Sequence, residues 1–239
     1  MKKWTIVATT LILCGCLLFA GVMIELDWDF SKLSTDQFET NSYELFEPYY
    51  NVRIVTDTAH VSILPAEDRI TAVDCYELTS AKHTVSIQDG TLTVEVQDTR
   101  QWYEHIGFHF ESATVKVYLP SGVYSDLTIE CNTGDVEIAP DFRFNKIAID
   151  LDTGDVINRA SAKESITICT DTGDVHLDGC DAATLKIETD TGDVTGTLLS
   201  DKVFLAHTST GDVNIPHTNT GGRCEITTDT GDIDVSIQK

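Results

Sequence analysis

The sequence repeats a short acidic motif whose residues are known for hydrolytic chemistry. TDTGDV occupies residues 170–175 and again 189–194, and TDTGDI occupies 228–233. Asp-Thr-Gly is the active-site signature of aspartic proteases, in which two such loops face each other and their carboxylates share a proton. The first question is therefore whether these aspartates cleave peptide bonds or hold a turn.

The spacing of the motif favours a structural role. Its glycines are 20, 19, 19, 19 and 20 residues apart, at Gly134, Gly154, Gly173, Gly192, Gly211 and Gly231. Such a period marks a repeat architecture. The aspartates two residues before the glycines then recur along one wall of the repeat, and they do not meet as a pair. We predict structural turns, in which glycine permits a positive φ and Asp and Thr side chains hydrogen-bond the backbone, and no catalytic residue.

A second acidic column follows the glycines. Its members are Asp135, Asp155, Asp174, Asp193, Asp212 and Asp232. Unit charges stacked ~4.8 Å apart repel by ~0.9 kcal/mol in water, so backbone donors or bound cations must offset the repulsion. Calcium prefers such oxygen ligands, although the glycine-rich nine-residue repeat of calcium-binding β-rolls is absent. Apart from this possible calcium ladder, we predict no metal and no cofactor.

The segment QWYEHIGFHF (101–110) is the remaining candidate site. Trp102 and Tyr103 could stack on a sugar, and His105 could supply a metal ligand. His105 and His109 would share a face only on a helix, which this glycine-containing aromatic stretch does not predict. The alternative is an aromatic loop that closes the open end of the core.

The residues around each glycine alternate as in a half-buried strand. Positions seven and five before the glycine are mostly apolar, position four is mostly polar, and Val or Ile stands two after it. Each unit is therefore a strand, a Thr-Gly corner, a short strand and a return loop. Stacked units turn each column into a core ladder. The predicted fold class is all-β, a parallel β-solenoid of 19–20-residue coils, with Ile187 between Ile168 and Ala206.

Irregular copies precede the regular coils. TDTAHV (56–61) has alanine in place of the glycine and is interpreted as a first coil. HTVSIQDGTLTVEV (83–96) predicts a hairpin around an Asp-Gly turn, and TVKVYLP (114–120) predicts another strand. The first part of the β domain is therefore expected to be wider and less regular than the rest.

The N-terminus has a different composition. Trp4 to Ile24 is an uncharged apolar run of 21 residues, long enough to cross a bilayer core of roughly 30 Å as a helix. Lysines precede the run and acidic residues follow it, so the positive-inside rule places the N-terminus in the cytoplasm and the rest outside. Two alternatives stay open, namely cleavage as a signal peptide and lipidation at Cys16 in LCGC.

These patterns divide the chain into a membrane anchor (1–24), a polar spacer (25–50) and a solenoid domain (51–239), irregular over 51–120 and regular over 121–239. The net charge of -23 would repel nucleic acid and anionic lipid head groups, so the expected membrane contact is the helix alone. Five cysteines follow the anchor, an odd number without CxxC, so neither a disulfide framework nor a zinc site is predicted.

Several of these stretches together resemble a known family. TDTAHV, RQWYEHIGF (100–108), YLPSG (118–122) and the serial DTGDV and STGDV units, after a membrane-anchoring start, resemble the bacterial putative-adhesin family of β-strand-repeat domains. The resemblance covers residues from about 40 to 239. It implies a β-solenoid displayed outside the membrane, with adhesion or envelope-stress roles, and it carries no catalytic motif.

We therefore expect a non-catalytic, single-pass protein of the cell membrane whose extracytoplasmic domain binds or scaffolds at the bacterial envelope. Its partner would be a cell-wall glycan or an envelope protein. One alternative is a β-helix carbohydrate-active enzyme, which needs a base and usually calcium or arginine beside a groove. Arg143, Arg159 and Arg223 are scattered, which weakens that alternative. The other alternative is a calcium-binding repeat protein.

Overall fold

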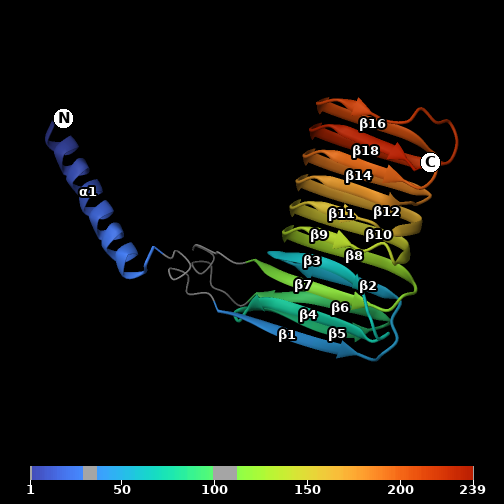
Figure 1. Cartoon of the computed structure of the whole chain (residues 1–239), viewed down its shortest axis with the longest axis horizontal. Helices are drawn as coiled ribbons and strands as arrows, with labels where there is room; N and C mark the ends of the chain where they lie inside the picture. The colour runs from blue at the N-terminus through green and yellow to red at the C-terminus, as the bar shows by residue number, and fades with distance from the viewer. Residues whose placement is uncertain (1, 29–36, 99–111, 239) are drawn as a thin grey trace. The chain divides into compact units, whose positions relative to one another are not determined.

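The computed structural model describes residues 2–28, 37–98 and 112–238, which form one helix and nineteen strands. The chain divides into two compact units. One comprises residues 1–37 and 100–111 and contains the helix. The other comprises residues 38–99 and 112–239 and contains the strands (Figure 1).

Helix α1 (Lys2–Glu25) is apolar on all sides. Within it, Trp4–Glu25 has a mean hydropathy of 2.4 and is long and apolar enough to cross a membrane, a property that signal sequences share. Large side chains such as Trp4 and Leu18 are exposed. A helix with apolar residues all round is typical of a membrane span or a buried helix.

The strands build two walls of a solenoid. Along the stack, the first wall contains β16 (Lys202–Thr210), β18 (Gly222–Thr230), β14 (Thr184–Thr191), β12 (Ser161–Thr172), β10 (Arg143–Thr153), β8 (Val123–Thr133), β2 (Asn51–Thr56), β6 (Thr91–Asp98) and β5 (Ala81–Gln88). The second contains β17 (Val213–Asn214), β19 (Ile233–Ile237), β15 (Val194–Leu198), β13 (Val175–Cys180), β11 (Val156–Asn158), β9 (Val136–Ile138), β3 (Ala59–Pro65), β7 (Ala113–Leu119), β4 (Thr71–Leu78) and β1 (Phe38–Leu45).

Most neighbouring strands are parallel and in register, so equivalent residues of successive coils lie side by side. Ile149 pairs with Ile168, and Ile168 pairs with Ile187. Antiparallel pairing is confined to the end that contains β1, β4 and β5. The prediction of a β-solenoid preceded by an apolar helix is therefore confirmed.

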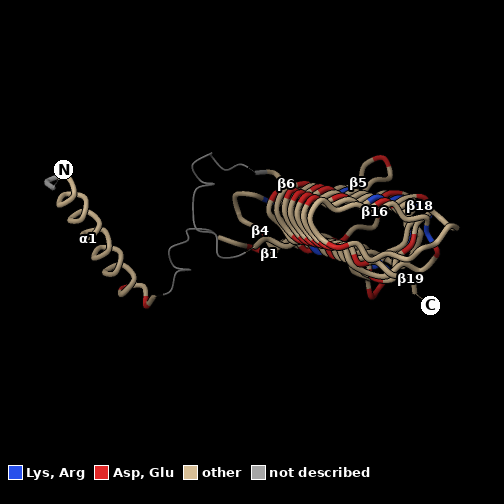
Figure 2. The backbone as a smooth tube through the Cα atoms, turned by 90° about the horizontal axis from the view of Figure 1, so that it is seen from above, with Lys and Arg blue, Asp and Glu red and all other residues tan. Residues whose placement is uncertain are grey.

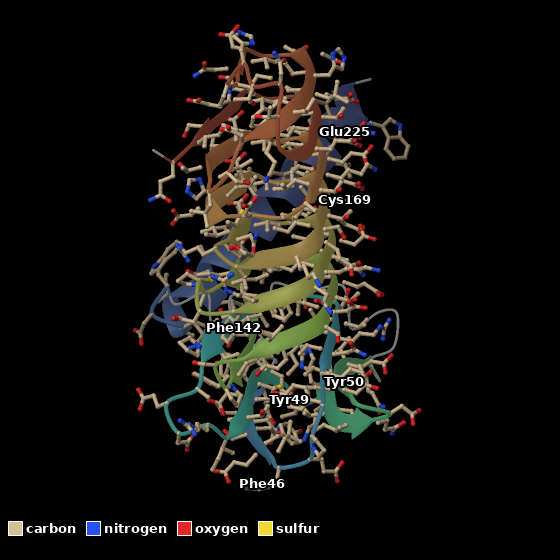
Figure 3. The ribbon with its side chains drawn as sticks, turned by 90° about the vertical axis from the view of Figure 1, so that its right-hand side faces the viewer. Phe46, Tyr49, Tyr50, Phe142, Cys169 and Glu225 are labelled. Atoms are coloured by element: carbon tan, nitrogen blue, oxygen red, sulfur yellow. The ribbon has the colours of Figure 1, made fainter. Side chains whose placement is uncertain are left out.

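The apolar columns fill the space between the walls. Residues five and seven positions before the corner glycines are buried from β8 to β14, as are Val136, Val156, Val175 and Val194 after the glycines. Polar residues alternate with them on the outside, and Cys169 and Glu225 lie at the outer face of the first wall (Figure 3). Burying these three apolar columns is the main stabilising term of such a fold.

The first part of the domain contains the predicted hairpin and coil. β5 and β6 pair antiparallel around Asp89 and Gly90, whose φ values of 50° and 72° suit a tight hairpin turn. β2 and β3 form a coil that pairs with β8 and β9. One boundary was wrong. β1 lies within the predicted spacer 25–50 and pairs with β4, so the β domain begins at Phe38.

The order of the last coils also differs from the prediction. β18 pairs with β14 on one side and with β16 on the other, so Ile187 lies between Ile168 and Ile226, and Ala206 lies one coil further on. The final coil of the chain is thus inserted beneath the coil made before it, as Figure 1 shows.

Two features explain the inserted coil. The inward residues Cys224, Ile226 and Ile233 of the inserted coil are fully buried. Their equivalents in the displaced coil are only partly buried (Phe204 and Ala206) or exposed (Val213), as suits the end of the stack. The return loop also needs glycine to pass between its neighbours. A Cβ on Gly221 would lie 1.7 Å from the Asp201 carbonyl oxygen, and one on Gly222 would lie 2.2 Å from that of Ala183.

Candidate functional site

The acidic column after the glycines forms a hydrogen-bonded ladder. The backbone N–H of Asp174 donates to Asp155 Oδ1 at 2.8 Å, and that of Asp193 donates to Asp174 Oδ1 at the same distance. The ladder follows the spatial order of the coils, since the N–H of Asp232 donates to Asp193 and that of Asp212 donates to Asp232. Seen along the stack, acidic residues recur at the same places of successive coils (Figure 2).

The first rung of this ladder is a histidine. In TDTAHV, His60 stands where the other coils have aspartate, and its Nδ1 lies 3.0 Å from the backbone nitrogen of Asp135. The hydrogen bond requires Nδ1 to be unprotonated. Asp135 in turn accepts from the N–H of Asp155 at 3.0 Å. Each of these side chains therefore ties one coil to the next.

The corner glycines allow the coils to approach this closely. Gly134, Gly154, Gly173, Gly192, Gly211 and Gly231 have φ values between 147° and 156°. A Cβ on Gly173 would lie 2.0 Å from the carbonyl oxygen of Gly154 in the neighbouring coil, which no side-chain movement could relieve. The threonine three residues before the glycine adds a further link, since Thr228 Oγ1 donates to the Gly192 carbonyl at 3.1 Å.

These contacts bear on the chemistry first considered for the aspartates. Five of the six ladder carboxylates, those of Asp135, Asp155, Asp174, Asp193 and Asp232, use Oδ1 to accept a backbone N–H. Each such charge-assisted bond contributes about 1.5–3 kcal/mol, which offsets repulsion between exposed charges. The second oxygen of Asp135 lies 3.2 Å from His60 Nδ1. Calcium binding along the ladder stays an alternative hypothesis. The aspartates of the Asp-Thr-Gly triplets, such as Asp171 and Asp190, hold equivalent places in neighbouring parallel strands. They therefore do not present the facing pair that an aspartic protease requires.

The predicted ligand-binding residues Trp102, Tyr103 and His105 lie outside the residues that the structure describes. Their segment joins β6 to β7, which pair with β2 and β3 respectively. In the coil of β2 and β3 the equivalent connection is the short corner at 57–58. The binding role of these residues stays a prediction.

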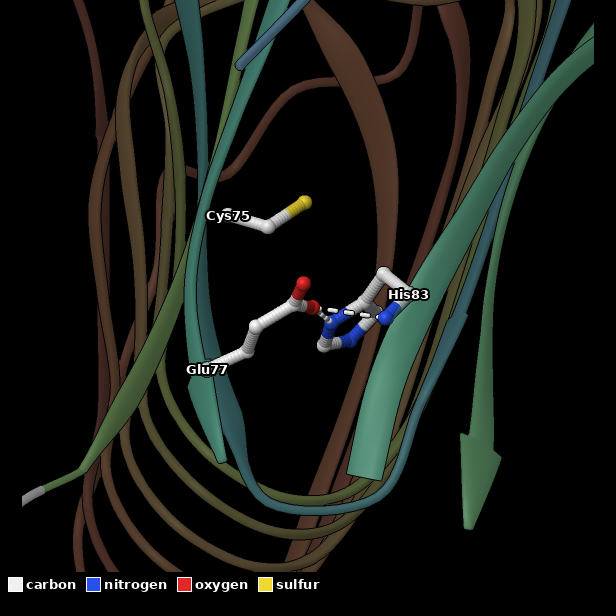
Figure 4. Close-up of side chains that lie close together, drawn as sticks. All are labelled: Cys75, Glu77 and His83. Atoms are coloured by element: carbon white, nitrogen blue, oxygen red, sulfur yellow. Dashed lines mark hydrogen bonds and ion pairs between the residues drawn. The ribbon is translucent and has the colours of Figure 1, made fainter. Parts of the chain in front are cut away.

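A buried polar cluster that the sequence analysis did not identify lies near the antiparallel end. Cys75 and Glu77 project inward from β4, and His83 projects inward from β5, so that the three side chains meet between the walls (Figure 4). Their residues are 0%, 0% and 4% exposed. One ligand atom of each lies within 4.8 Å of the others.

Hydrogen bonds hold the Glu77 and His83 side chains of the cluster in place. Glu77 Oε2 accepts from the backbone N–H of His83 at 2.6 Å and lies 2.7 Å from His83 Nδ1. Glu77 Oε1 accepts from Asn41 Nδ2 at 2.7 Å. His83 Nε2 lies 2.9 Å from Thr56 Oγ1. Burial, with the nearby Glu77 and Asp74 charges, raises the pKa of the Cys75 thiol to about 12.

The chain from Glu77 through His83 to Thr56 has the order of an acid, a base and a hydroxyl nucleophile. Thr56 is only 4% exposed, however, so its hydroxyl is buried in the core and is not presented at the surface. The donor set could instead hold a metal ion. A sequence signal for the cluster existed, because Glu77 continues the inward phase of Thr71, Val73 and Cys75, where an apolar residue is expected.

A shallow pocket of about 420 Å³ lies at the return loops near the end of the stack. Arg143, Lys163 and Lys202 contribute cations to its lining. The Lys202 side chain is only 2% exposed, forms an ion pair with Asp181 and donates to Ser200 Oγ at 2.6 Å. The exposed Arg143 and Lys163 concentrate positive charge at one place on a strongly acidic protein.

Solved structures with a similar fold come from bacteria. A cell adhesion protein from Clostridium sporogenes, described as putative, has a TM-score of 0.50 at 10% identity, over 85% of this chain and all of that one. A putative adhesin from Bacteroides fragilis has a TM-score of 0.46 at 11% identity, over 86% of this chain and 99% of that one. A putative adhesin from Parabacteroides distasonis has a TM-score of 0.42 at 12% identity, over 85% of this chain and 98% of that one. At these identities the likeness concerns the fold alone.

A search of proteins with curated functions found no match. The model of the Toastrack DUF4097 family, a domain of unknown function, matches residues 49–239. That range contains all the glycine corners and the coil of β2 and β3, two of the features on which the resemblance to β-strand-repeat adhesins rested. The resemblance is thereby confirmed, and the chain belongs to the Toastrack DUF4097 family.

Proposed function

We propose that this protein is a non-catalytic, single-pass membrane protein whose β-solenoid lies outside the cytoplasmic membrane and acts by binding at the bacterial envelope. One observation carries the proposal. A helix that is apolar on all sides and long enough to cross a bilayer precedes a solenoid whose recurring polar corner residues bind one coil to the next. Such a solenoid offers long, regular faces for contact with a partner.

Charge supports the orientation. Lys2 and Lys3 precede the apolar span, whereas Glu25 and Asp27 follow it. The positive-inside rule then assigns the N-terminus to the cytoplasm and the solenoid to the outer side. Adhesion roles suggested for structurally similar proteins agree with this location.

Protease treatment of intact, wall-stripped cells tests the location. We expect an added protease to remove the solenoid and leave a membrane-embedded N-terminal stub, detected by an N-terminal tag. A cytoplasmic protein serves as the control for cell integrity. Full protection of the solenoid in intact cells, together with digestion after lysis, would contradict the proposed orientation.

The pocket with Arg143, Lys163 and Lys202 is the place we propose for an anionic group of a cell-wall glycan. Its cations would attract such a group in spite of the net charge of -23. The purified full chain, kept in detergent, is applied to arrays of envelope glycans. We expect Lys163→Glu to abolish binding to acidic glycans, whereas Lys116→Glu, the same charge change on exposed β7, leaves it intact. Equal effects of the two changes would contradict a role for the pocket.

A further inference from the structure

We propose that Cys75, Glu77 and His83 bind one Zn²⁺ ion inside the antiparallel end of the solenoid. This inference is independent of the proposed envelope function. It rests on three side chains with metal-binding atoms that meet in the core, with those atoms all within 4.8 Å of one another. The ion would join β4 of the second wall to β5 of the first.

The donor chemistry suits zinc. A thiolate sulfur, an imidazole nitrogen and a carboxylate oxygen are the three ligand types that zinc takes in proteins. A thiolate and a carboxylate together carry two negative charges, which a divalent cation neutralises. A neutral complex is much less costly to bury in an apolar core than a separate charge.

The positions of the ligand atoms are compatible with one shared ion. Zinc bonds of ~2.0–2.3 Å place tetrahedral ligand atoms roughly 3.3–3.7 Å apart. Glu77 Oε2 and His83 Nδ1 are now 2.7 Å apart and would separate slightly as the ion takes the place of the proton between them. The Cys75 sulfur would move closer and release its proton to solvent.

The surrounding hydrogen bonds match those of a metal site. Asn41 donates to Glu77 Oε1, the oxygen that the ion would not need, at 2.7 Å. Thr56 Oγ1 is positioned to accept from His83 Nε2 at 2.9 Å, which leaves Nδ1 free to bind the ion. A second partner that fixes each ligand in this way is usual around bound metals. Cys180 and Cys224, which are equally buried, are not part of such a cluster within the described residues.

Cobalt provides the test, since thiolate-bound Co²⁺ has a charge-transfer absorption band that carboxylate and imidazole ligands do not produce. The full chain is expressed in cobalt-supplemented medium, so that the ion enters during folding, and is purified in detergent. We expect about one cobalt per chain and the thiolate band. Cys75→Ser should remove the band, whereas the matched control Cys224→Ser, at another buried thiol, should keep it.

Two further variants protect the test against loss of folding. Glu77→Gln keeps the size of the side chain and should remove most of the bound cobalt. Asn41→Ala changes only the outer hydrogen bond and should keep the band while weakening affinity by about 10- to 100-fold in competition with a chelator. Folded wild-type protein without cobalt, or a band that survives Cys75→Ser, would overturn the proposal and leave the cluster as a hydrogen-bonded network.

Discussion

Replacing one corner glycine should separate two coils of the solenoid. In Gly173→Ala the new Cβ would lie 2.0 Å from the Gly154 carbonyl oxygen, well inside the usual carbon–oxygen contact of ~3.3 Å. The Gly154 oxygen is a backbone atom and the new Cβ is bonded directly to the backbone, so no side-chain rotation can separate them. The two coils must therefore move apart by about 1 Å. The φ of 151° is also unfavourable for alanine and costs ~1–3 kcal/mol.

The hydrogen bonds at this corner give the rest of the cost. The N–H of Gly154 donates to the Thr172 carbonyl at 2.9 Å, that of Val156 to the Asp174 carbonyl at 2.8 Å, and that of Asp174 to Asp155 Oδ1 at 2.8 Å. Each contributes ~1 kcal/mol net. If two or three of them weaken, Gly173→Ala should lower the free energy of unfolding by ~3–6 kcal/mol.

Gly179→Ala is the matched control. Gly179 also has a positive φ, 65°, but its added Cβ would meet only a Leu199 methyl carbon at 4.0 Å. Gly179→Ala should lower the free energy of unfolding by only ~1–2 kcal/mol, the cost of placing alanine in the left-handed backbone conformation. Urea unfolding of the full chain in detergent, followed by β-sheet circular dichroism, measures both. If Gly173→Ala is no more destabilising than Gly179→Ala, close backbone contact does not explain the corner glycines.

Four further outcomes are expected. Asp193→Asn should leave the free energy of unfolding unchanged or slightly higher, since the amide keeps the acceptor for the Asp232 N–H, whereas Asp193→Ala should lower it by ~1 kcal/mol or more. Ile187→Asp should lower the free energy of unfolding by several kcal/mol, because it buries an unpaired charge. Glu188→Lys, at a half-exposed outer position, should lower it by less than ~1 kcal/mol. Similar losses for the two changes would mean that the inward and outward residues of this strand are wrongly assigned. Burial raises the pKa of the Cys180 thiol from 9.0 to about 12, so the unfolded chain loses this proton at lower pH than the folded chain does. The free energy of unfolding should therefore fall as pH rises above 9. Cys180→Ala should make the difference between the free energies of unfolding at pH 8 and pH 10 smaller. Millimolar Ca²⁺ added after chelation should shift Tm by only a few degrees, and a rise of about ten would favour a calcium ladder.

The coil itself could be predicted because each of its parts has a local cause. The 19–20-residue period, the alternation before Gly154 and Gly173, and the Val after each corner all express contacts that recur in every coil. The order of the coils could not be predicted in the same way. All regular coils present the same columns to their neighbours, so the repeat pattern does not specify which coil pairs with which. The only local signs were Gly221 and Gly222, which pass between neighbouring return loops.

The buried cluster was harder to predict for a different reason. Glu77 departs from an apolar phase and marks a polar position in the core, but its partners Asn41 and His83 come from two other strands. His83 in turn contacts Thr56 of a third strand. Asn41 was assigned to a spacer, and Thr56 to a corner motif. Which inward side chains face each other across the core depends on how the two walls meet, and a single strand carries no information about that.

The inserted last coil has a consequence for synthesis. β16 and β17 leave the ribosome before β18 and β19, since they come earlier in the chain. Among the described residues, β18 and β19 are the strands of the next coil with which they pair. Until residues 222–239 have been made, the nascent chain therefore presents open strand edges at β14 and β15, and β16 and β17 lack their partners. Such edges recruit strands from other chains. A chain that is truncated near residue 221 should therefore aggregate readily, although most of the solenoid would already be formed.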